Sequence, residues 1–128
     1  MNRTASSRPM GCSARNGAPG RLFVAQFDVF ENPNRVQREG FPYLVVMQSD
    51  QLDHYSTRLV MPLTRMVNPP ALLPRRLTQT VRVSGEALHP AAHLSAALPE
   101  RLLRGPIASL RSQADILRDA LDAVLSGV

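Results

Sequence analysis

The side chains best suited to metal binding are few and widely spaced in this chain. Its 128 residues contain three histidines, His54, His89 and His93, and a single cysteine, Cys12. His89 and His93 have the four-residue spacing of two ligands on one helical turn, but Pro90 lies between them and disfavours a helix. No cysteine or acidic residue completes a ligand set. We therefore expect no metal site.

Motifs for covalent or acid–base catalysis are equally scarce. Ser49, His54 and a nearby aspartate have the residue types of a catalytic triad, but almost any chain of this length offers such a combination. There is no Gly-x-Ser-x-Gly elbow and no glycine-rich phosphate loop, and the ten acidic residues are scattered. The sequence thus contains no motif that predicts an enzyme.

The basic charge of the chain is concentrated near its N-terminus. All 15 basic residues are arginine, and the net charge is +5. Residues 1–23 hold four arginines and no acidic residue, whereas residues 24–128 hold 11 arginines against 10 acidic residues. A domain this close to neutral lacks the basic surface that direct nucleic-acid binding needs. The lone cysteine fits a reducing compartment, and the apolar run at 22–25 is too short for a membrane span. We expect a cytoplasmic protein.

Residues 1–23 are expected to form a disordered leader ahead of one domain at 24–128. The leader combines Arg, Ser, Gly, Asn and Pro without apolar periodicity. A valine codon (GUG) can serve as a bacterial start, so Val24 is an alternative beginning of the protein. Residues 1–23 would then correspond to upstream DNA.

Short apolar segments between turn residues predict a mostly antiparallel β domain. We expect strands at 26–30, 43–47, 58–63, 77–83 and 107–110, with a turn at 84–86, while 91–98 is ambiguous. The 43–47 segment is apolar throughout, which is typical of a central strand covered on both faces. It should pair with 58–63 as a hairpin, in which Pro62 needs an edge, a bulge or a strand end.

One clear helix is predicted at the C-terminus. Ser112 followed by Asp115 indicates an N-cap, and Gly127 is placed to cap the other end. Arg118 can pair with Asp115 or Asp122 on the polar face. The apolar stripe of this helix consists of Ile116, Leu117, Ala120, Leu121, Val124 and Leu125.

Several blocks in the same order resemble the CcdB-type toxins of bacterial toxin–antitoxin modules. The strongest match is YLVVMQSD at 43–50, followed by LD at 52–53 and TRLVMPL at 57–63. Further matches are FDVF at 27–30, NP at 32–33, PIASL at 106–110, DI at 115–116, ALD at 120–122 and the final Gly-Val. The resemblance covers about residues 24–128.

The resemblance implies a mostly β fold, a small SH3-like antiparallel β barrel with a single C-terminal α-helix. It implies a homodimeric toxin that binds the GyrA subunit of DNA gyrase, traps the enzyme on cleaved DNA and is neutralised by a CcdA-like antitoxin. It also implies neither catalysis nor a cofactor. No direct contact with nucleic acid or membrane is expected of the toxin alone.

The family's gyrase-contacting end is Trp or a smaller residue, then Gly, then Ile. It maps onto Ser126, Gly127 and Val128, with Asp122 and Leu125 just before it on the same helix. The match is partial, because Ser126 cannot bury the roughly 150–250 Å² of an aromatic side chain.

The Gln-Ser-Asp turn lies near this surface in the family, which makes Ser49 and Asp50 further candidates for gyrase contact. An alternative role for both is a hydrogen-bonded turn that organises the hairpin. Two other functions also stay open. One is a degenerate homologue that no longer poisons gyrase; the other is a MazF/Kid-type endoribonuclease toxin, which shares the barrel but needs a basic RNA groove and an acid–base pair.

Overall fold

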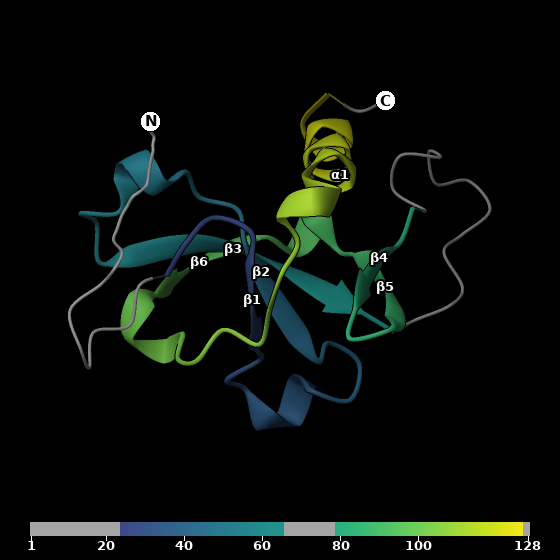
Figure 1. The fold of residues 1–128 in the computed structure, drawn as a ribbon, viewed down its shortest axis with the longest axis horizontal. Coiled ribbons are helices and arrows are strands. Elements are labelled where there is room, and N and C mark those ends of the chain that lie inside the picture. The colour runs from purple at the N-terminus through teal and green to yellow at the C-terminus, as the bar shows by residue number, and fades with distance from the viewer. Residues whose placement is uncertain (1–23, 66–78, 127–128) are drawn as a thin grey trace.

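The computed structural model describes residues 24–65 and 79–126 (Figure 1). The predictions for residues 1–23, Leu77, Gly127 and Val128 therefore lie outside the described residues. The strands and the helix are β1 Asp28–Glu31, β2 Tyr43–Val46, β3 Thr57–Thr64, β4 Val81–Val83, β5 Glu86–Pro90, β6 Ala96–Pro99, β7 Ala108–Ser109 and α1 Ala114–Ser126. Short 3-10 turns between them are η1 Arg35–Gln37, η2 Asp50–Leu52, η4 Ala92–Leu94, η5 Glu100–Leu102 and η6 Arg111–Gln113.

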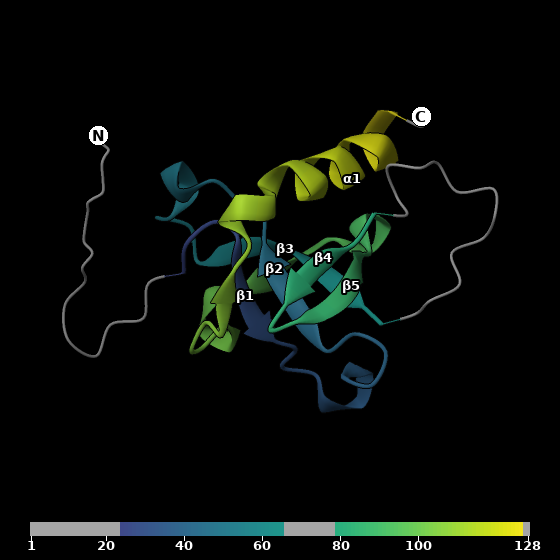
Figure 2. The same ribbon diagram turned by 45° about the vertical axis from the view of Figure 1, so that its right-hand side comes forward.

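The strands form a nearly closed antiparallel barrel, and α1 lies across one side of it (Figure 2). The strand order is β4-β5-β3-β2-β1-β7, and β6 pairs with the first half of β3. The predicted mostly β fold class with one C-terminal helix is confirmed. The 91–98 segment, which the sequence left ambiguous, divides into η4 and the start of β6.

The predicted β2–β3 hairpin is present, and the register explains how β3 accommodates Pro62. Pro62 lies opposite Leu44 of β2. On its other edge β3 pairs with β6 from Thr57 to Val60 and with β5 only from Leu63 onward. The proline thus lies where β3 changes its partner from β6 to β5, so its missing N–H interrupts neither of these two pairings. Its carbonyl still accepts a 2.8 Å hydrogen bond from the backbone N–H of Ala91.

Strand β2 is buried on both faces, as its uninterrupted apolar sequence predicts. Val45 points into a core that includes Met61 and the buried side of α1. Leu44 and Val46 point the opposite way, into a second core with Phe30. The helix is fastened to the first core by Ala114, Leu117 and Ala120.

The β4–β5 hairpin confirms the predicted turn. Ser84 and Gly85 have φ of 51° and 83°. Two consecutive residues with positive φ make the tight turn whose twist matches the flanking strands. Val81 and Val83 face the core, as the alternation predicts.

The first strand starts later than predicted, at Asp28 rather than at residue 26. Phe27 has φ of 72°, which turns the backbone out of the extended conformation. Its N–H and carbonyl are satisfied by Val46 and Leu110, and the guanidinium of Arg118 lies 5.2 Å from its ring. These contacts hold a conformation that sequence periodicity does not reveal.

The predicted N-cap at Ser112 is wrong, because the chain enters the helix through the η6 turn and α1 begins only at Ala114. That turn is held by Gln113, whose side chain bonds the N–H and the carbonyl of Arg82 at 2.9 and 3.1 Å. The predicted ion pair between Arg118 and Asp115 is present at 3.8 Å.

The buried face of α1 differs from the predicted apolar stripe. Val124 and Leu125 are exposed, although the periodicity places them on the buried face. The small residues Ala114 and Ala123 are buried in addition to Leu117 and Ala120. The end of the helix rises away from the strands (Figure 2), and Val124 and Leu125 meet solvent although Ala123 beside them is buried.

Candidate partner-binding site

The last turn of α1 carries three of the predicted contact residues. Asp122, Leu125 and Ser126 lie at or near the surface, and Leu125 leaves 78% of its surface in solvent. Two turns earlier, Leu117 is fully buried. The helix is therefore fixed to the barrel at one end and presents an apolar side chain at the other.

The Ser49–Asp50 turn is exposed and closely hydrogen-bonded. Ser49 caps η2, and its hydroxyl oxygen accepts a 3.2 Å bond from the N–H of Gln51. The Asp50 carboxylate accepts a 2.7 Å bond from the N–H of Gln26, which ties the turn to the start of the domain. The turn-forming role expected as the alternative is thus observed, while both residues remain at the surface.

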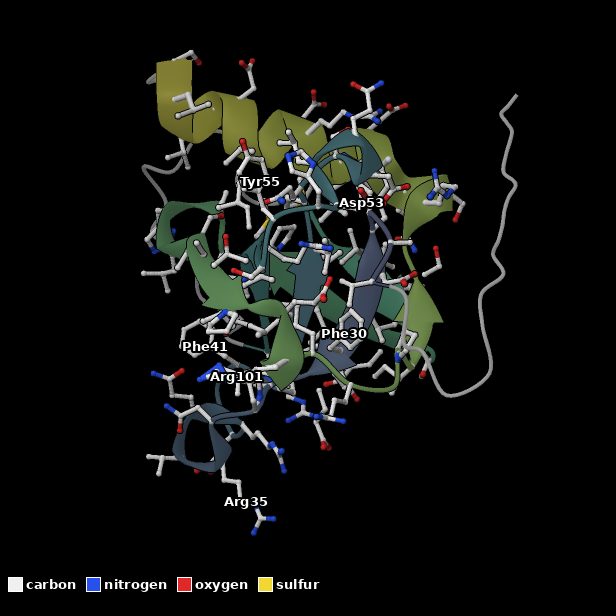
Figure 3. The ribbon with its side chains drawn as sticks, turned by 90° about the vertical axis from the view of Figure 1, so that its left-hand side faces the viewer. Phe30, Arg35, Phe41, Asp53, Tyr55 and Arg101 are labelled. Carbon is white, nitrogen blue, oxygen red and sulfur yellow. The ribbon has the colours of Figure 1, made fainter. Side chains whose placement is uncertain are left out.

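The structure brings the five predicted site residues that it describes onto one side of the molecule. In Figures 1 and 2, η2 and the segment after it lie on the same side of the sheet as α1. Figure 3 views the molecule from this segment, with α1 above Asp53 and Tyr55. We call residues 49–56 the 49–56 loop, and this loop together with Asp122–Ser126 the partner-binding face.

A buried arginine that sequence reasoning missed holds the 49–56 loop. Arg58 is only 3% exposed. Its guanidinium donates to the carbonyl oxygens of Tyr55, Thr57 and Asp53, the last two at 2.9 and 2.8 Å. It also donates to the Glu100 carboxylate in an ion pair. The available sequence signal was a charged residue within the apolar TRLVMPL segment, but its partner lies 42 residues further along the chain.

Gln48 closes the base of the same loop. Its side-chain amide nitrogen lies 3.2 Å from the carbonyl oxygens of both Leu52 and Thr57. Its amide oxygen accepts a 3.1 Å bond from the N–H of Leu59. One side chain therefore joins the beginning of the loop to its end, which explains the structural need for glutamine before Ser49.

The tip of the loop exposes apolar and aromatic surface. Leu52 and Tyr55 are both exposed. The ring of Tyr55 lies against His54, with ring centroids 4.2 Å apart. The loop thus offers apolar contact area from a backbone that Gln48 and Arg58 hold in place.

The comparison with protein families decides the identity. The family model described as CcdB protein matches residues 26–127. The chain belongs to the CcdB family. This is a family of non-enzymatic toxins from toxin–antitoxin modules, in agreement with the resemblance found in the sequence. No curated protein matches the chain.

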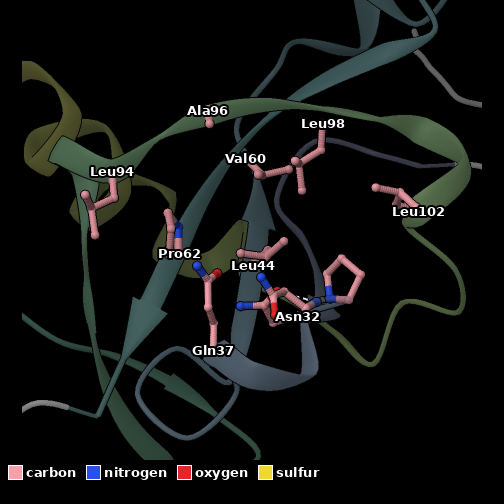
Figure 4. A pocket seen from close by; sticks show the side chains of 11 residues that line it. Asn32, Gln37, Leu44, Val60, Pro62, Leu94, Ala96, Leu98 and Leu102 are labelled. Atoms are coloured by element: carbon pink, nitrogen blue, oxygen red, sulfur yellow. Dashed lines mark hydrogen bonds between the residues drawn. The ribbon is translucent and has the colours of Figure 1, made fainter.

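This CcdB-family chain also has a groove lined mainly by apolar side chains (Figure 4). Its volume is about 420 Å³. The amide of Asn32 at one end is already engaged, since it donates to the Phe41 carbonyl at 2.9 Å and accepts from the Asn34 N–H at 2.9 Å. Other residues that line the groove include Leu44, Val60, Pro62, Leu94, Ala96 and Leu98.

The described residues of this CcdB relative offer no cluster for metal chemistry. No three His, Cys, Asp or Glu side chains lie close enough within 24–65 and 79–126 to hold an ion. His89 is nevertheless notable, because its buried Nδ1 has no hydrogen-bond partner in that part of the chain. Among the described segments, none of the helices is long and apolar enough to cross a membrane.

Proposed function

We propose that this CcdB-family toxin binds the GyrA subunit of DNA gyrase and traps the gyrase–DNA cleavage complex. The observation that carries the proposal is the exposed Leu125 on the last turn of a helix whose earlier turns are packed into the barrel. An apolar side chain on a rigid support loses little conformational freedom when it enters a partner. The sequence continues from this turn into Gly127 and Val128, which extend the apolar contact.

Trapping requires selective binding and no chemistry by the toxin. A ligand that binds only the cleaved state of gyrase lowers the free energy of that state and raises its population. The contacts proposed for this task are Leu125, Ser126, Gly127 and Val128, supported by Asp122, Ser49 and Asp50. Such a mechanism fits a protein without a catalytic motif.

We further propose that the toxin is a homodimer in the cytoplasm and that a CcdA-like antitoxin neutralises it. A domain of this size buries about 60–70% of its unfolded surface, so pairing adds useful stability. The apolar surface near α1 and the neighbouring strands is available for such a contact. A single 14 kDa species in sedimentation at micromolar concentration would contradict the dimer.

One experiment separates the proposed function from its rivals. The pure protein is incubated with gyrase and supercoiled plasmid, and the products are released with detergent. Linear DNA is the expected product and indicates poisoning. Cleavage of added RNA would indicate an endoribonuclease, and neither product would indicate a degenerate homologue.

A further inference from the structure

The 49–56 loop carries the one phenylalanine or tyrosine that is exposed in the described segments. Tyr55 leaves 55% of its surface in solvent. Phe27 and Phe30 are buried in the two cores, and Phe41 and Tyr43 are not exposed either, Tyr43 being half-buried. Tyr55 belongs to neither of the two cores, so packing inside the barrel does not explain this aromatic side chain.

Tyr55 is held in place before any partner arrives. Its N–H donates to the Leu52 carbonyl at 3.2 Å, its own carbonyl accepts from Arg58, and its ring lies on His54. Binding through such a side chain costs little ordering entropy. Tyr and Trp are also enriched among the residues that contribute most to protein–protein binding.

The burial of Arg58 serves the loop rather than the barrel. A second arginine, Arg65, follows the other end of β3 and pairs with Glu86, but this pair lies at the surface, with side chains 46% and 36% exposed. Burying a guanidinium is costly unless its donors are satisfied. The guanidinium of Arg58 is satisfied by four acceptors. Two are carbonyl oxygens of the loop, one is the carbonyl oxygen of the adjacent Thr57, and the last is the Glu100 carboxylate.

We propose that Tyr55 is the aromatic anchor of the gyrase-binding face and that Arg58 is its positioning residue. This inference rests on the proposed function. The last described turn of α1 supplies Leu125 and Ser126 but no aromatic side chain. Tyr55 lies on the same side of the sheet as α1 (Figure 3) and supplies that missing surface. Its ring fills an apolar recess of GyrA, with the hydroxyl at the wet edge.

The anchor is tested with the full chain and purified GyrA. Tyr55→Ala should weaken the affinity by about 30-fold, the scale of a residue that dominates an interface. Tyr55→Phe keeps the ring and should weaken it by only about fivefold, the value of one hydrogen bond. Val36→Ala is the matched control, because Val36 is 90% exposed on η1 and lies outside the partner-binding face. The melting temperature should be unchanged in all three variants.

The positioning role is tested by Arg58→Met. It should weaken gyrase binding about as much as Tyr55→Ala and speed amide exchange at Asp53 and Tyr55, whose N–H groups bond within the loop. Arg65→Met removes the exposed pair and should change neither measurement. Hydrogen bonding to Glu86 raises the pKa of Arg65, so this control arginine is charged throughout the assay range.

Val81→Ala tests whether lower stability by itself weakens gyrase binding, because it opens a core position without touching the loop. This variant should melt earlier yet bind gyrase normally. If Arg58→Met fails to fold, Arg58→Lys takes its place, since a lysine ammonium keeps the charge beside Glu100 but cannot bond the three carbonyl oxygens and the carboxylate together.

The outcomes separate the inference from the proposed function. Wild-type protein that does not bind gyrase overturns the proposed function, and the anchor falls with it. Wild-type binding together with less than threefold loss for Tyr55→Ala overturns the anchor alone. Normal loop exchange and normal affinity in Arg58→Met, or in Arg58→Lys where that variant replaces it, overturn the positioning role.

Discussion

The first two turns of α1 and its last turn are built from similar apolar residues, yet they have different surroundings. Leu117 and Ala120 are completely buried against the barrel. Val124 and Leu125 continue the same stripe about one turn after Ala120 and are exposed. The last turn still keeps one small residue, Ala123, against the protein, but its larger apolar side chains meet solvent where the helix rises away from the strands (Figure 2).

Under the proposed function, this contrast separates stability from partner binding within one helix of 13 residues. A buried leucine contributes about 1.5–3 kcal/mol through loss of its apolar surface from water. An exposed leucine contributes almost nothing to folding and leaves its surface for a partner. Substitutions at the two ends should therefore affect different measurements.

Leu117→Ala should have the largest effect on stability. Removing a fully buried leucine leaves a cavity between α1 and the sheet and should cost about 3 kcal/mol of unfolding free energy. Toxicity should fall only in proportion to the unfolded fraction. Urea denaturation measures the cost; a loss below about 1 kcal/mol would mean that the helix is not fastened to the barrel at this position.

Deletion of residues 126–128 should give the opposite result. These residues follow the supported part of α1, so the unfolding free energy should change by less than about 1 kcal/mol. Toxicity should disappear while antitoxin binding persists, because the terminal contact with gyrase is lost. Cell killing by the truncated protein at equal expression would refute the role of the tail.

Leu125→Ala should affect gyrase binding more than folding. Alanine has the higher helix propensity, and little packing is lost at a side chain 78% exposed, so stability should stay within about 0.5 kcal/mol. Loss of a contact leucine should weaken the affinity for GyrA by about tenfold. A melting temperature lowered by several degrees, with unchanged affinity, would mean that Leu125 stabilises the fold, as Leu117 does, and does not contact GyrA.

The comparison also shows how much the sequence could predict. The β2–β3 hairpin and the Ser84–Gly85 turn follow from local patterns, because periodicity and turn chemistry act over a few residues. Periodicity likewise identifies the apolar stripe of α1. It cannot tell which side chains of the helix the barrel covers, and so it predicts burial of Val124 and Leu125 and misses that of Ala123.

Features that depend on distant partners were beyond prediction. The burial of Arg58 follows from an ion pair with Glu100, and the positive φ of Phe27 is held by Val46 and Leu110. The members of the candidate site, from Ser49 and Asp50 to the end of α1, were named from the family resemblance, and their contact with gyrase stays a prediction. The role of the buried arginine behind the loop could be read only from the folded chain.

Ser126→Trp has the smallest expected effect on stability and sharpens the comparison most. The residue is exposed at the end of α1, so a larger side chain meets no core atom and the unfolding free energy should be nearly constant. If GyrA contacts this turn, an indole adds buried area there and should raise the affinity about tenfold. The comparison is made by titrating gyrase poisoning with both proteins. Equal potency would mean that GyrA does not reach residue 126, which would leave the 49–56 loop as the part of the partner-binding face that makes the contact.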